Sequence, residues 1–251
     1  MCGERMGKII SIVSGKGGTG KTTTTANLAV ALGKLGKSVV AVDGDLTMAN
    51  LSLVMGLDDA SVTIHDVLIG TAEIKDAIYA IPDFENVHVI PAAIDWEHVM
   101  KADPRGLPSV IKPLKEQFDY VLIDCPAGLQ VDAMSAMLSG EEVLLVTNPE
   151  ISCMTDTMKV GIVLKRAGLA MLGFVLNRYG RSSNDIPPDA AEEVMEVPLL
   201  AVIPEDPAVR EATLEGIPVV AYKPTSDGAK AFMALAQEIE RISGFKARVM
   251  Y

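Results

Sequence analysis

Residues 8–25, KIISIVSGKGGTGKTTTT, decide the fold of this 251-residue chain. The apolar run at 9–13 is typical of a buried strand, and the pattern at 22–35 predicts a helix. Between them stands G-x-x-x-x-G-K-T, the phosphate-binding loop in the strand–loop–helix context that it requires. Glycines let the backbone turn tightly, so that its N–H groups can surround phosphate oxygens. The sequence therefore predicts a nucleoside triphosphate site, and a plain glycine-rich turn is the less favoured interpretation.

The residues of this loop have distinct expected tasks. Backbone N–H groups at the start of the helix favour negative phosphate groups. Lys21 is expected to reach the β- and γ-phosphates, and the Thr22 hydroxyl is a candidate ligand for Mg²⁺. The predicted nucleotide contacts in this segment are Gly15, Lys16, Gly17, Gly18, Thr19, Gly20, Lys21, Thr22 and Thr23.

The composition narrows the class of protein. Apolar residues make up 49% of the chain and aromatic residues only 4%, so we expect an aliphatic core, as in a buried parallel sheet. The net charge of −11 disfavours binding of nucleic acid through a broad basic face. Three widely spaced cysteines without a C-x-x-C pair indicate a reducing, cytoplasmic compartment rather than disulfides or a zinc site. No apolar run approaches the ~18 residues of a membrane-spanning helix and no signal peptide is expected, which leaves attachment to a membrane surface open.

Strand and helix patterns alternate along the rest of the chain. The expected strands are residues 8–13, 38–43, 87–91, 120–124, 142–147, 172–177 and 199–203. The expected helices are residues 22–35, 107–116, 131–139, 152–166 and 229–242. This alternation predicts an α/β fold with one doubly wound, mostly parallel sheet, helices on both faces, and ligands at the carboxyl ends of the strands. We expect one domain, residues 1–251, with a Pro-Pro pair in a polar surface loop at 180–189.

Acidic residues end two of the expected strands. Asp43 closes the run VVAVD, and Asp45 follows one glycine later. Asp124 closes YVLID in the same way. Carboxylates beside a triphosphate can hold Mg²⁺ or orient the attacking water. For the D-G-D segment, a turn with solvated carboxylates is the competing interpretation, because Asp and Gly are common in turns.

With an early lysine, Lys16, in KGGTGKT, and with DGD and DCPAG further along, the chain resembles the MinD/ParA group of deviant-Walker ATPases. The resemblance covers most of the chain and implies a P-loop fold that binds ATP and Mg²⁺ and hydrolyses ATP. It implies that Lys16 crosses a dimer interface and touches the partner's nucleotide, whereas a solvated loop lysine is the alternative. The implied catalytic residues are Lys16, Lys21 and Asp45, of which Asp45 activates water. The implied metal site consists of Thr22, Asp43 and Asp124.

The same resemblance implies an adenine site in two later segments. FVLNR ends in Asn177-Arg178, and VIPED contributes Pro204, Glu205 and Asp206. An Asn amide can donate and accept hydrogen bonds at once, which suits the N6/N1 edge of adenine. Judged without the resemblance, an Asn that caps a loop is an equally good interpretation.

Several other residues are expected to be structural. His65, His88 and His98 lack the spacing of metal ligands. Cys125 is expected to be a small buried thiol and not a nucleophile. Trp96 is expected to anchor packing within residues 92–100.

Residues 244–251 form a short tail that is basic and apolar in an acidic chain. Gly244 is expected to end the preceding helix. In the family such a tail contacts the membrane, and pairing two tails in a dimer would strengthen weak binding by avidity. A frayed terminus is the alternative interpretation.

The motifs fit MinD-like members of the family best. This implies an ATP-bound homodimer at an anionic membrane surface, cytoplasmic or peripheral at the inner face of the cell membrane, that acts in division-site placement or related spatial regulation. MinE-like activators and MinC-like effectors are the implied protein partners, and nucleic acid is not expected. A ParA-like partitioning ATPase, which needs a basic DNA-binding surface, and an iron–sulfur scaffold ATPase, which needs clustered cysteines, are the competing hypotheses.

Overall fold

The computed structural model describes residues 6–57 and 59–249, and side chains up to Gly244. The strands are β1 Lys8–Val13, β2 Val39–Asp43, β3 Tyr79–Ile81, β4 Phe84–Ile90, β5 Tyr120–Asp124, β6 Glu142–Thr147, β7 Ala170–Tyr179 and β8 Leu199–Pro204. The α-helices are α1 Lys21–Lys34, α2 Leu51–Val54, α3 Ile64–Ile69, α4 Trp96–Lys101, α5 Leu107–Ile111, α6 Val131–Leu138, α7 Ile151–Arg166, α8 Pro188–Met195, α9 Pro207–Leu214, α10 Val219–Tyr222 and α11 Asp227–Val249. Short 3₁₀ helices are η1 Ile74–Ala77, η2 Pro104–Gly106 and η3 Lys112–Glu116.

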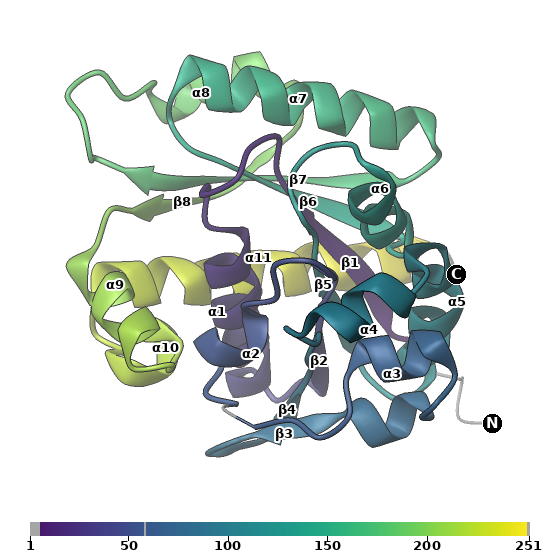
Figure 1. Ribbon diagram of the computed structural model, residues 1–251. Helices are drawn as coiled ribbons and strands as arrows, with labels where there is room; N and C mark the ends of the chain where they lie inside the picture. Colours follow the sequence, from purple (N-terminus) through teal and green to yellow (C-terminus); the bar gives the residue numbers. More distant parts are fainter. Residues whose placement is uncertain (1–5, 58, 250–251) are drawn as a thin grey trace.

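Within these described ranges the strands form one eight-stranded sheet in the order β3-β4-β2-β5-β1-β6-β7-β8. All pairs are parallel except β3 with β4. From β1 the chain leaves toward β2, whereas from β5 it crosses over to β6 on the other side of β1. The carboxyl end of β1 is therefore the switch point where ligands bind in open α/β sheets, and it carries the phosphate-binding loop. Figure 1 shows α7 and α8 on one side of β6–β8 and α11 on the other.

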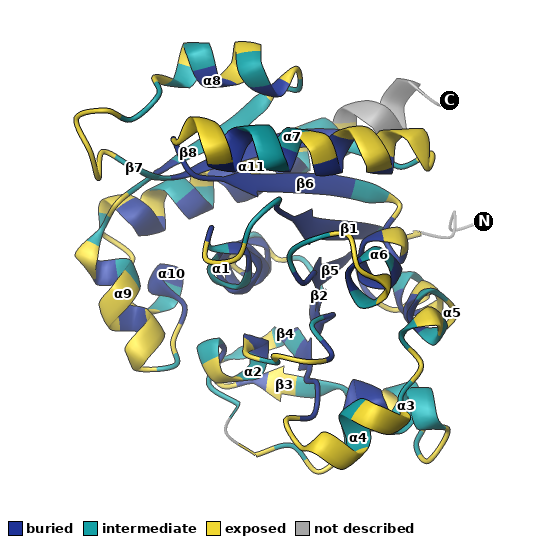
Figure 2. Cartoon of the chain, turned by 45° about the horizontal axis from the view of Figure 1, so that its top comes forward, coloured by how far each residue is buried: buried dark blue, intermediate teal, exposed yellow. Residues whose placement is uncertain are grey.

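Alternating side chains on the strands build a core on each face of the sheet. In β1, Ile10 and Ile12 pack with α1 and α11 on one face, and Ile9 and Val13 pack with α6 and α7 on the other. Both faces are covered, which explains why the strands are continuous runs of Val, Ile and Leu. Figure 2 shows the central strands as buried, whereas α4 at the periphery is largely exposed.

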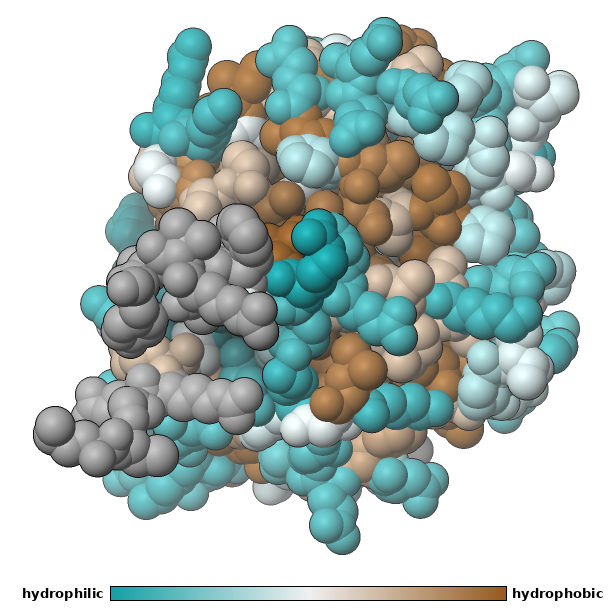
Figure 3. Space-filling view, turned by 180° about the vertical axis from the view of Figure 1, so that it is seen from behind, coloured by the Kyte–Doolittle hydropathy of each residue, from teal (hydrophilic) through white to brown (hydrophobic). Residues whose placement is uncertain are grey.

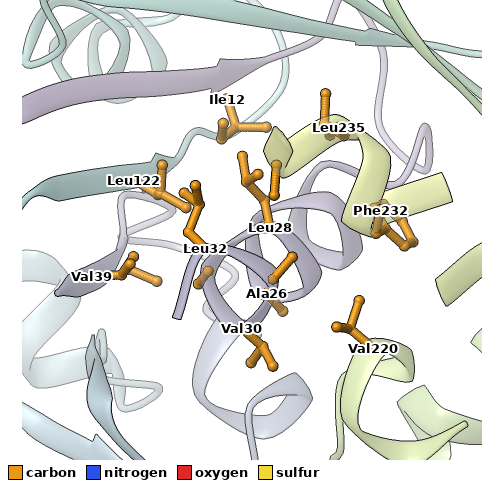
Figure 4. Packing of buried hydrophobic residues seen from close by; sticks show 14 of the residues in the cluster. Ile12, Ala26, Leu28, Val30, Leu32, Val39, Leu122, Val220, Phe232 and Leu235 are labelled. Atoms are coloured by element: carbon orange, nitrogen blue, oxygen red, sulfur yellow. The ribbon is translucent and has the colours of Figure 1, made fainter. Parts of the chain in front are cut away.

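The helix after the phosphate-binding loop lies at the centre of one core. Leu28 and Leu32 of α1 are fully buried against Ile12 of β1 and against Phe232 and Leu235 of α11, as Figure 4 shows. Each such side chain contributes about 1.5–3 kcal/mol by leaving water. The packing on α1 therefore holds the loop at its N-terminus in a fixed place relative to the sheet.

The predicted doubly wound, mostly parallel sheet is confirmed, and every predicted strand is present. β4 begins earlier than predicted, and β7 extends to Tyr179. β3 was not predicted, because its three residues, Tyr79–Ile81, are too few to show a strand periodicity.

The predicted helices are only partly correct. The helix predicted at 107–116 divides into α5 and the 3₁₀ helix η3, whose second residue, Pro113, has no N–H for an α-helical hydrogen bond. The predicted surface loop at 180–189 ends earlier, because Pro188 is the first residue of α8, where a missing N–H costs nothing. The helices α2, α3, α4, α8, α9 and α10 were missed, since four to eight residues are too few to establish a helical period.

The prediction that Gly244 ends the last helix is wrong, because α11 continues through Gly244 to Val249. The tail prediction, residues 244–251, reaches beyond the described side chains, and its last two residues lie outside the described part of the chain. Among the residues that are described, no helix is long and apolar enough to cross a bilayer. The back of the molecule presents hydrophilic side chains among smaller hydrophobic areas (Figure 3). Contact between the tail, residues 244–251, and a membrane stays a prediction.

Candidate functional site

The phosphate-binding loop joins Val13 of β1 to Lys21 of α1. Gly18 and Gly20 adopt left-handed backbone angles, with φ of +76° and +96°. A side chain at Gly20 would also collide with the Asn177 amide, since a Cβ there would lie 2.2 Å from Asn177 Nδ2. Gly20 is thus required both by its backbone angle and by the close approach of β7.

Lys21 lies inside the loop, and only 9% of the residue is exposed. Its Nζ donates to Ser14 Oγ over 2.9 Å, and the Ser14 hydroxyl donates to the Lys16 carbonyl over 2.7 Å. Burial lowers the pKa of Lys21, while the negative charge of Asp124 acts in the opposite direction. The ammonium is therefore held where the loop curls around it, in position for an anionic ligand.

The α7 helix supports the other end of the loop. The Gly15 N–H donates to Thr157 Oγ1 over 3.1 Å, and the Thr157 hydroxyl donates to the Cys153 carbonyl over 2.8 Å. Lys16 Nζ lies 3.3 Å from the Asp156 carboxylate. The sequence did not point to Asp156 or Thr157, because they lie more than a hundred residues from the loop and carry no motif.

Replacing Gly15 by Ala is expected to destabilise the fold by about 1–3 kcal/mol, because inserted atoms in a packed interior force neighbours apart. A Cβ at Gly15 would lie 2.2 Å from the Asp156 carbonyl carbon, which belongs to the α7 backbone and cannot rotate away. Gly17 is the matched control, since no atom lies within 4 Å of the place where its Cβ would be. Urea unfolding of both variants is the measurement. Equal stabilities of Gly15→Ala and Gly17→Ala would contradict the packing argument.

The two strand-end carboxylates predicted from the sequence lie side by side, since Asp43 and Asp124 are register partners on β2 and β5. Asp124 accepts hydrogen bonds from the Thr22 hydroxyl at 2.6 Å and the Thr25 hydroxyl at 3.3 Å. Burial raises the pKa of Asp124 to about 6, against the opposing effects of Thr22 and Lys21. Burial, together with the charge of Asp124, raises the pKa of Asp43 to about 8.

This arrangement fits a magnesium ion. Burial disfavours the ionised forms of these two carboxylates, and a nearby cation would stabilise those ionised forms. Thr22 adds a hydroxyl oxygen, a hard ligand of the type that Mg²⁺ prefers. Among the described residues no group of three or more His, Cys, Asp or Glu could hold a metal ion. A bound Mg²⁺ would therefore depend on Thr22 and Asp124 together with substrate oxygens and water, which is how Mg²⁺ is usually held.

Asp45 lies in the loop between β2 and α2. Its N–H donates to Asp43 Oδ1 over 3.1 Å, and the other Asp43 oxygen accepts from the N–H of Leu51 at the start of α2. The Asp45 carboxylate closes its own turn, accepting from the backbone N–H groups of Thr47 and Met48 over 3.3 and 2.9 Å. Asp43 thus fixes both ends of this loop, and Asp45 is oriented within it.

A cavity of about 360 Å³ adjoins the phosphate-binding loop. It is lined by the five residues predicted for the adenine site, Asn177, Arg178, Pro204, Glu205 and Asp206, and by Gly20 and Thr23 of the loop segment. Sequence reasoning missed the other lining residues, which carry no motif: Arg181, Ile203, Val209, Arg210, Thr213 and Leu214.

The orientation of the Asn177 amide in this cavity is fixed by the phosphate-binding loop. Its Nδ2 donates to the Thr19 carbonyl over 2.7 Å, so Oδ1 is the atom left to accept a hydrogen bond. An acceptor matches the amino group of adenine. Asp206 has an additional structural role, since its carboxylate accepts from the N–H groups of Ala208 and Gly228 over 2.9 and 2.8 Å and so caps α9.

The prediction that Trp96 anchors packing is wrong, because 75% of the residue is exposed on α4. The structure gives His65 and His98 polar surroundings. His65 is fully buried, and His98 lies between the carboxylates of Asp95 and Asp66, with its nitrogens 2.7 and 3.3 Å from them. The Cys125 thiol is buried, and its burial raises the pKa further above the physiological range, as expected of an inert thiol.

The ion pairs of His98 are expected to make stability depend on pH. Its hydrogen bond with Asp95 raises the pKa above the ordinary value of 6.5, with further contributions from the charges of Asp95 and Asp66. A raised pKa means that the protonated form stabilises the folded state below pH 6.5, and that this contribution is lost as the pH rises through the folded-state pKa. His98→Asn should therefore lower the Tm at acidic pH more than at alkaline pH. Thermal unfolding of both proteins across this range is the test, and a pH-independent difference would contradict the prediction.

Known proteins are similar to this chain in sequence and in fold. A family model described as an AAA domain matches residues 7–163. The septum site-determining protein MinD of Synechocystis sp. is 34% identical over 241 residues, covering 94% of this chain and 90% of the relative.

Two solved structures are more similar to the chain in sequence than this relative is, and a third is less similar. The cell division ATPase MinD of Pyrococcus furiosus shares 77% identity at a TM-score of 0.93, covering 94% of this chain and 100% of that one. The septum site-determining protein MinD of Pyrococcus horikoshii, complexed with Mg-ADP, shares 71% identity at a TM-score of 0.93, covering 96% and 99%. A chain of the MinC:MinD cell division protein complex of Aquifex aeolicus is 27% identical at a TM-score of 0.81, covering 93% of this chain and 96% of that one.

Proposed function

The chain belongs to the MinD/ParA family of P-loop ATPases, and from this premise we propose that it is a MinD-like switch. It binds ATP and Mg²⁺ and hydrolyses ATP. In the proposal, ATP brings two copies face to face, the pair attaches to an anionic membrane surface, and hydrolysis separates the copies and releases them. The role served is division-site placement or related spatial regulation, in the cytoplasm and at the inner face of the cell membrane.

The observation that carries this proposal is the position of Lys16. Its side chain is 41% exposed and points to Asp156 of α7, 3.3 Å away, whereas Lys21 occupies the interior of the same loop. A lysine held at the rim of its own site is available to the nucleotide of a second copy. A surface ion pair of this kind contributes little free energy, so exchanging Asp156 for a phosphate is not costly.

The remaining candidate residues are proposed to act within one copy. Lys21 and the loop N–H groups bind the phosphates, and Asn177 accepts a hydrogen bond from adenine at a pocket that Arg178, Pro204, Glu205 and Asp206 help to line. Thr22 and Asp124 hold Mg²⁺ with Asp43 beside them, and the ion, when bound, neutralises charge on the phosphate oxygens. Asp45 orients the attacking water.

Exposed apolar side chains around the site support pairing of two copies. Large apolar residues with at least two fifths of their surface exposed follow the ends of four parallel strands: Met48 after β2, Ile94 and Trp96 after β4, Leu129 and Val131 after β5, and Ile151 after β6. Carboxyl ends of parallel strands meet at one edge of the sheet, so these residues follow strands that end at the edge where the nucleotide site lies. Apolar groups gathered at one place on a surface are typical of interaction sites.

Light scattering and liposome sedimentation test the proposal on the full chain. We expect a dimer with a non-hydrolysable ATP analogue and a monomer with ADP. ATP-dependent sedimentation with anionic vesicles should be lost when the chain is truncated before Gly244. A chain that stays monomeric with the analogue, or that binds vesicles equally with ADP, would contradict the switch.

Two other functions known in the family are the competing hypotheses, and each would give a different experimental result. Salt-dependent DNA binding by the ATP form would favour a ParA-like role, which the net charge of −11 disfavours. An iron–sulfur scaffold would need clustered thiols, and among the described residues Cys125 and Cys153 are separately buried free cysteines. A MinC-like effector is a proposed partner, supported by the Aquifex aeolicus MinC:MinD complex, and a MinE-like activator is proposed from the family alone.

A further inference from the structure

His65 lies in the first turn of α3 and has no exposed surface. Its Nε2 lies 3.0 Å from the Leu46 carbonyl oxygen, and its Nδ1 lies 3.0 Å from the Ala93 backbone nitrogen. Leu46 directly follows Asp45 in the loop after β2, and Ala93 lies in the loop after β4. One buried imidazole therefore bridges two loops at the carboxyl edge of the sheet.

The two backbone partners determine the state of the ring. The Ala93 N–H can only donate, so Nδ1 must be the unprotonated acceptor, and the Leu46 carbonyl can only accept, so Nε2 must carry the proton. The opposite neutral tautomer would lose both hydrogen bonds. The imidazolium would place two N–H groups against each other at Ala93. Only the neutral Nε2–H form satisfies both loops.

We propose that His65 is a positioning residue for ATP hydrolysis, which fixes the loop carrying Asp45 against the loop that follows β4. This rests on the proposed role of Asp45 in orienting water. The loop is held at its two ends by the Asp43 carboxylate, through the N–H groups of Asp45 and Leu51. His65 adds a third fixed point, at Leu46, next to the residue that must be oriented.

The second loop is itself anchored, so the bridge has a rigid support. The N–H of Ile64, the residue before His65, donates to the Pro91 carbonyl over 2.8 Å. The start of α3 is closed by the reciprocal hydrogen bonds of Thr63 and Asp66. By contrast, Thr47 and Met48, which follow Leu46, are exposed. A water-orienting carboxylate loses activity when it is misplaced by about 1 Å, so a fixed point beside an exposed turn has a direct effect on turnover.

The test compares His65→Leu, which removes both hydrogen bonds, with His65→Gln, whose amide carries one acceptor and one donor and can replace them. We expect kcat for ATP hydrolysis to fall about 10-fold in His65→Leu and to recover in His65→Gln, with affinity for Mg-ADP unchanged in both. His88→Leu is the matched control, since His88 lies within strand β4, and its ring packs edge-on against Phe118. Equal kcat in wild type and His65→Leu would overturn the proposal. So would a parallel loss of kcat and ADP affinity in both His65 variants, because that is the pattern of a purely structural role.

Two further measurements keep the outcomes separable. In an Asp45→Asn background, His65→Leu should cause no additional loss, because both changes act on the same step. If Asp45→Asn alone hydrolyses ATP at the wild-type rate, the role proposed for Asp45 fails, irrespective of His65. Nitrogen NMR of wild-type His65 needs no variant, and a protonated Nδ1 would overturn the proposal even if His65→Leu does not fold.

Discussion

Replacing Lys16 by Ala is expected to lower the rate of ATP hydrolysis about 10³-fold, because a cation supplied in trans stabilises charge that develops on the transferred phosphoryl group. In the structure Lys16 reaches Asp156 and not the interior of its own loop. Affinity for Mg-ADP should therefore change less than about 5-fold, the scale of an exposed ion pair. Phosphate release at saturating ATP and titration with ADP separate the two effects.

Lys159→Ala is the matched control for this prediction. Lys159 pairs with the same Asp156 carboxylate, at 3.1 Å, from the exposed side of α7. Its removal breaks the same kind of ion pair and leaves Lys16 in place, so wild-type hydrolysis is expected. If Lys16→Ala turns over ATP as fast as wild type, action on a partner's nucleotide is excluded. If both variants slow hydrolysis equally, the effect belongs to Asp156.

The parts of the fold that were predictable are those in which a local pattern and the final environment agree. The buried strands show as short runs of β-branched residues, because a sheet covered on both faces allows no polar alternation. Trp96 shows the opposite case. A large aromatic residue is normally buried, but Trp96 lies on a six-residue helix with no buried residues, so the surroundings and not the residue type decided its exposure. The predicted helix end at Gly244 was wrong in the same way. The α11 helix continues past this glycine to Val249, so the residue type alone did not decide where the helix ends.

In the candidate site, too, the residues with a local sequence pattern were predictable, and those that act through contacts between distant parts of the chain were not. Asp43 and Asp124 could be identified because each ends a strand, and parallel pairing then placed them in register. The supports of the site could not be identified. Asp156 and Thr157 touch the loop from α7, and His65 bridges two loops from α3, all through contacts between distant parts of the chain. Nothing in a single sequence reports which backbone group a distant side chain will meet.

Asp45→Asn is expected to reduce kcat about 10²-fold. The Asn amide cannot accept a proton from the attacking water, and it has no charge with which to orient that water. The substitution is mild for the fold. One Asp45 oxygen, Oδ1, accepts from the N–H groups of Thr47 and Met48, and the carbonyl oxygen of an Asn side chain can keep both hydrogen bonds. Binding of ATP should be retained, so the ATP-bound dimer should accumulate in light scattering while phosphate release slows.

Asp45→Ala removes the cap as well as the charge and so separates the two roles of this side chain. If charge near the water is what matters, Asn and Ala should slow hydrolysis to a similar extent, and only Ala should also loosen the loop, seen as faster hydrogen exchange at Thr47 and Met48. If Asn hydrolyses ATP normally while Ala does not, the carboxylate serves only to close its own turn, and the water must be oriented by another group. The two roles are separable because closing the turn acts on the backbone N–H groups of Thr47 and Met48, whereas orienting the water acts on the rate of the chemical step.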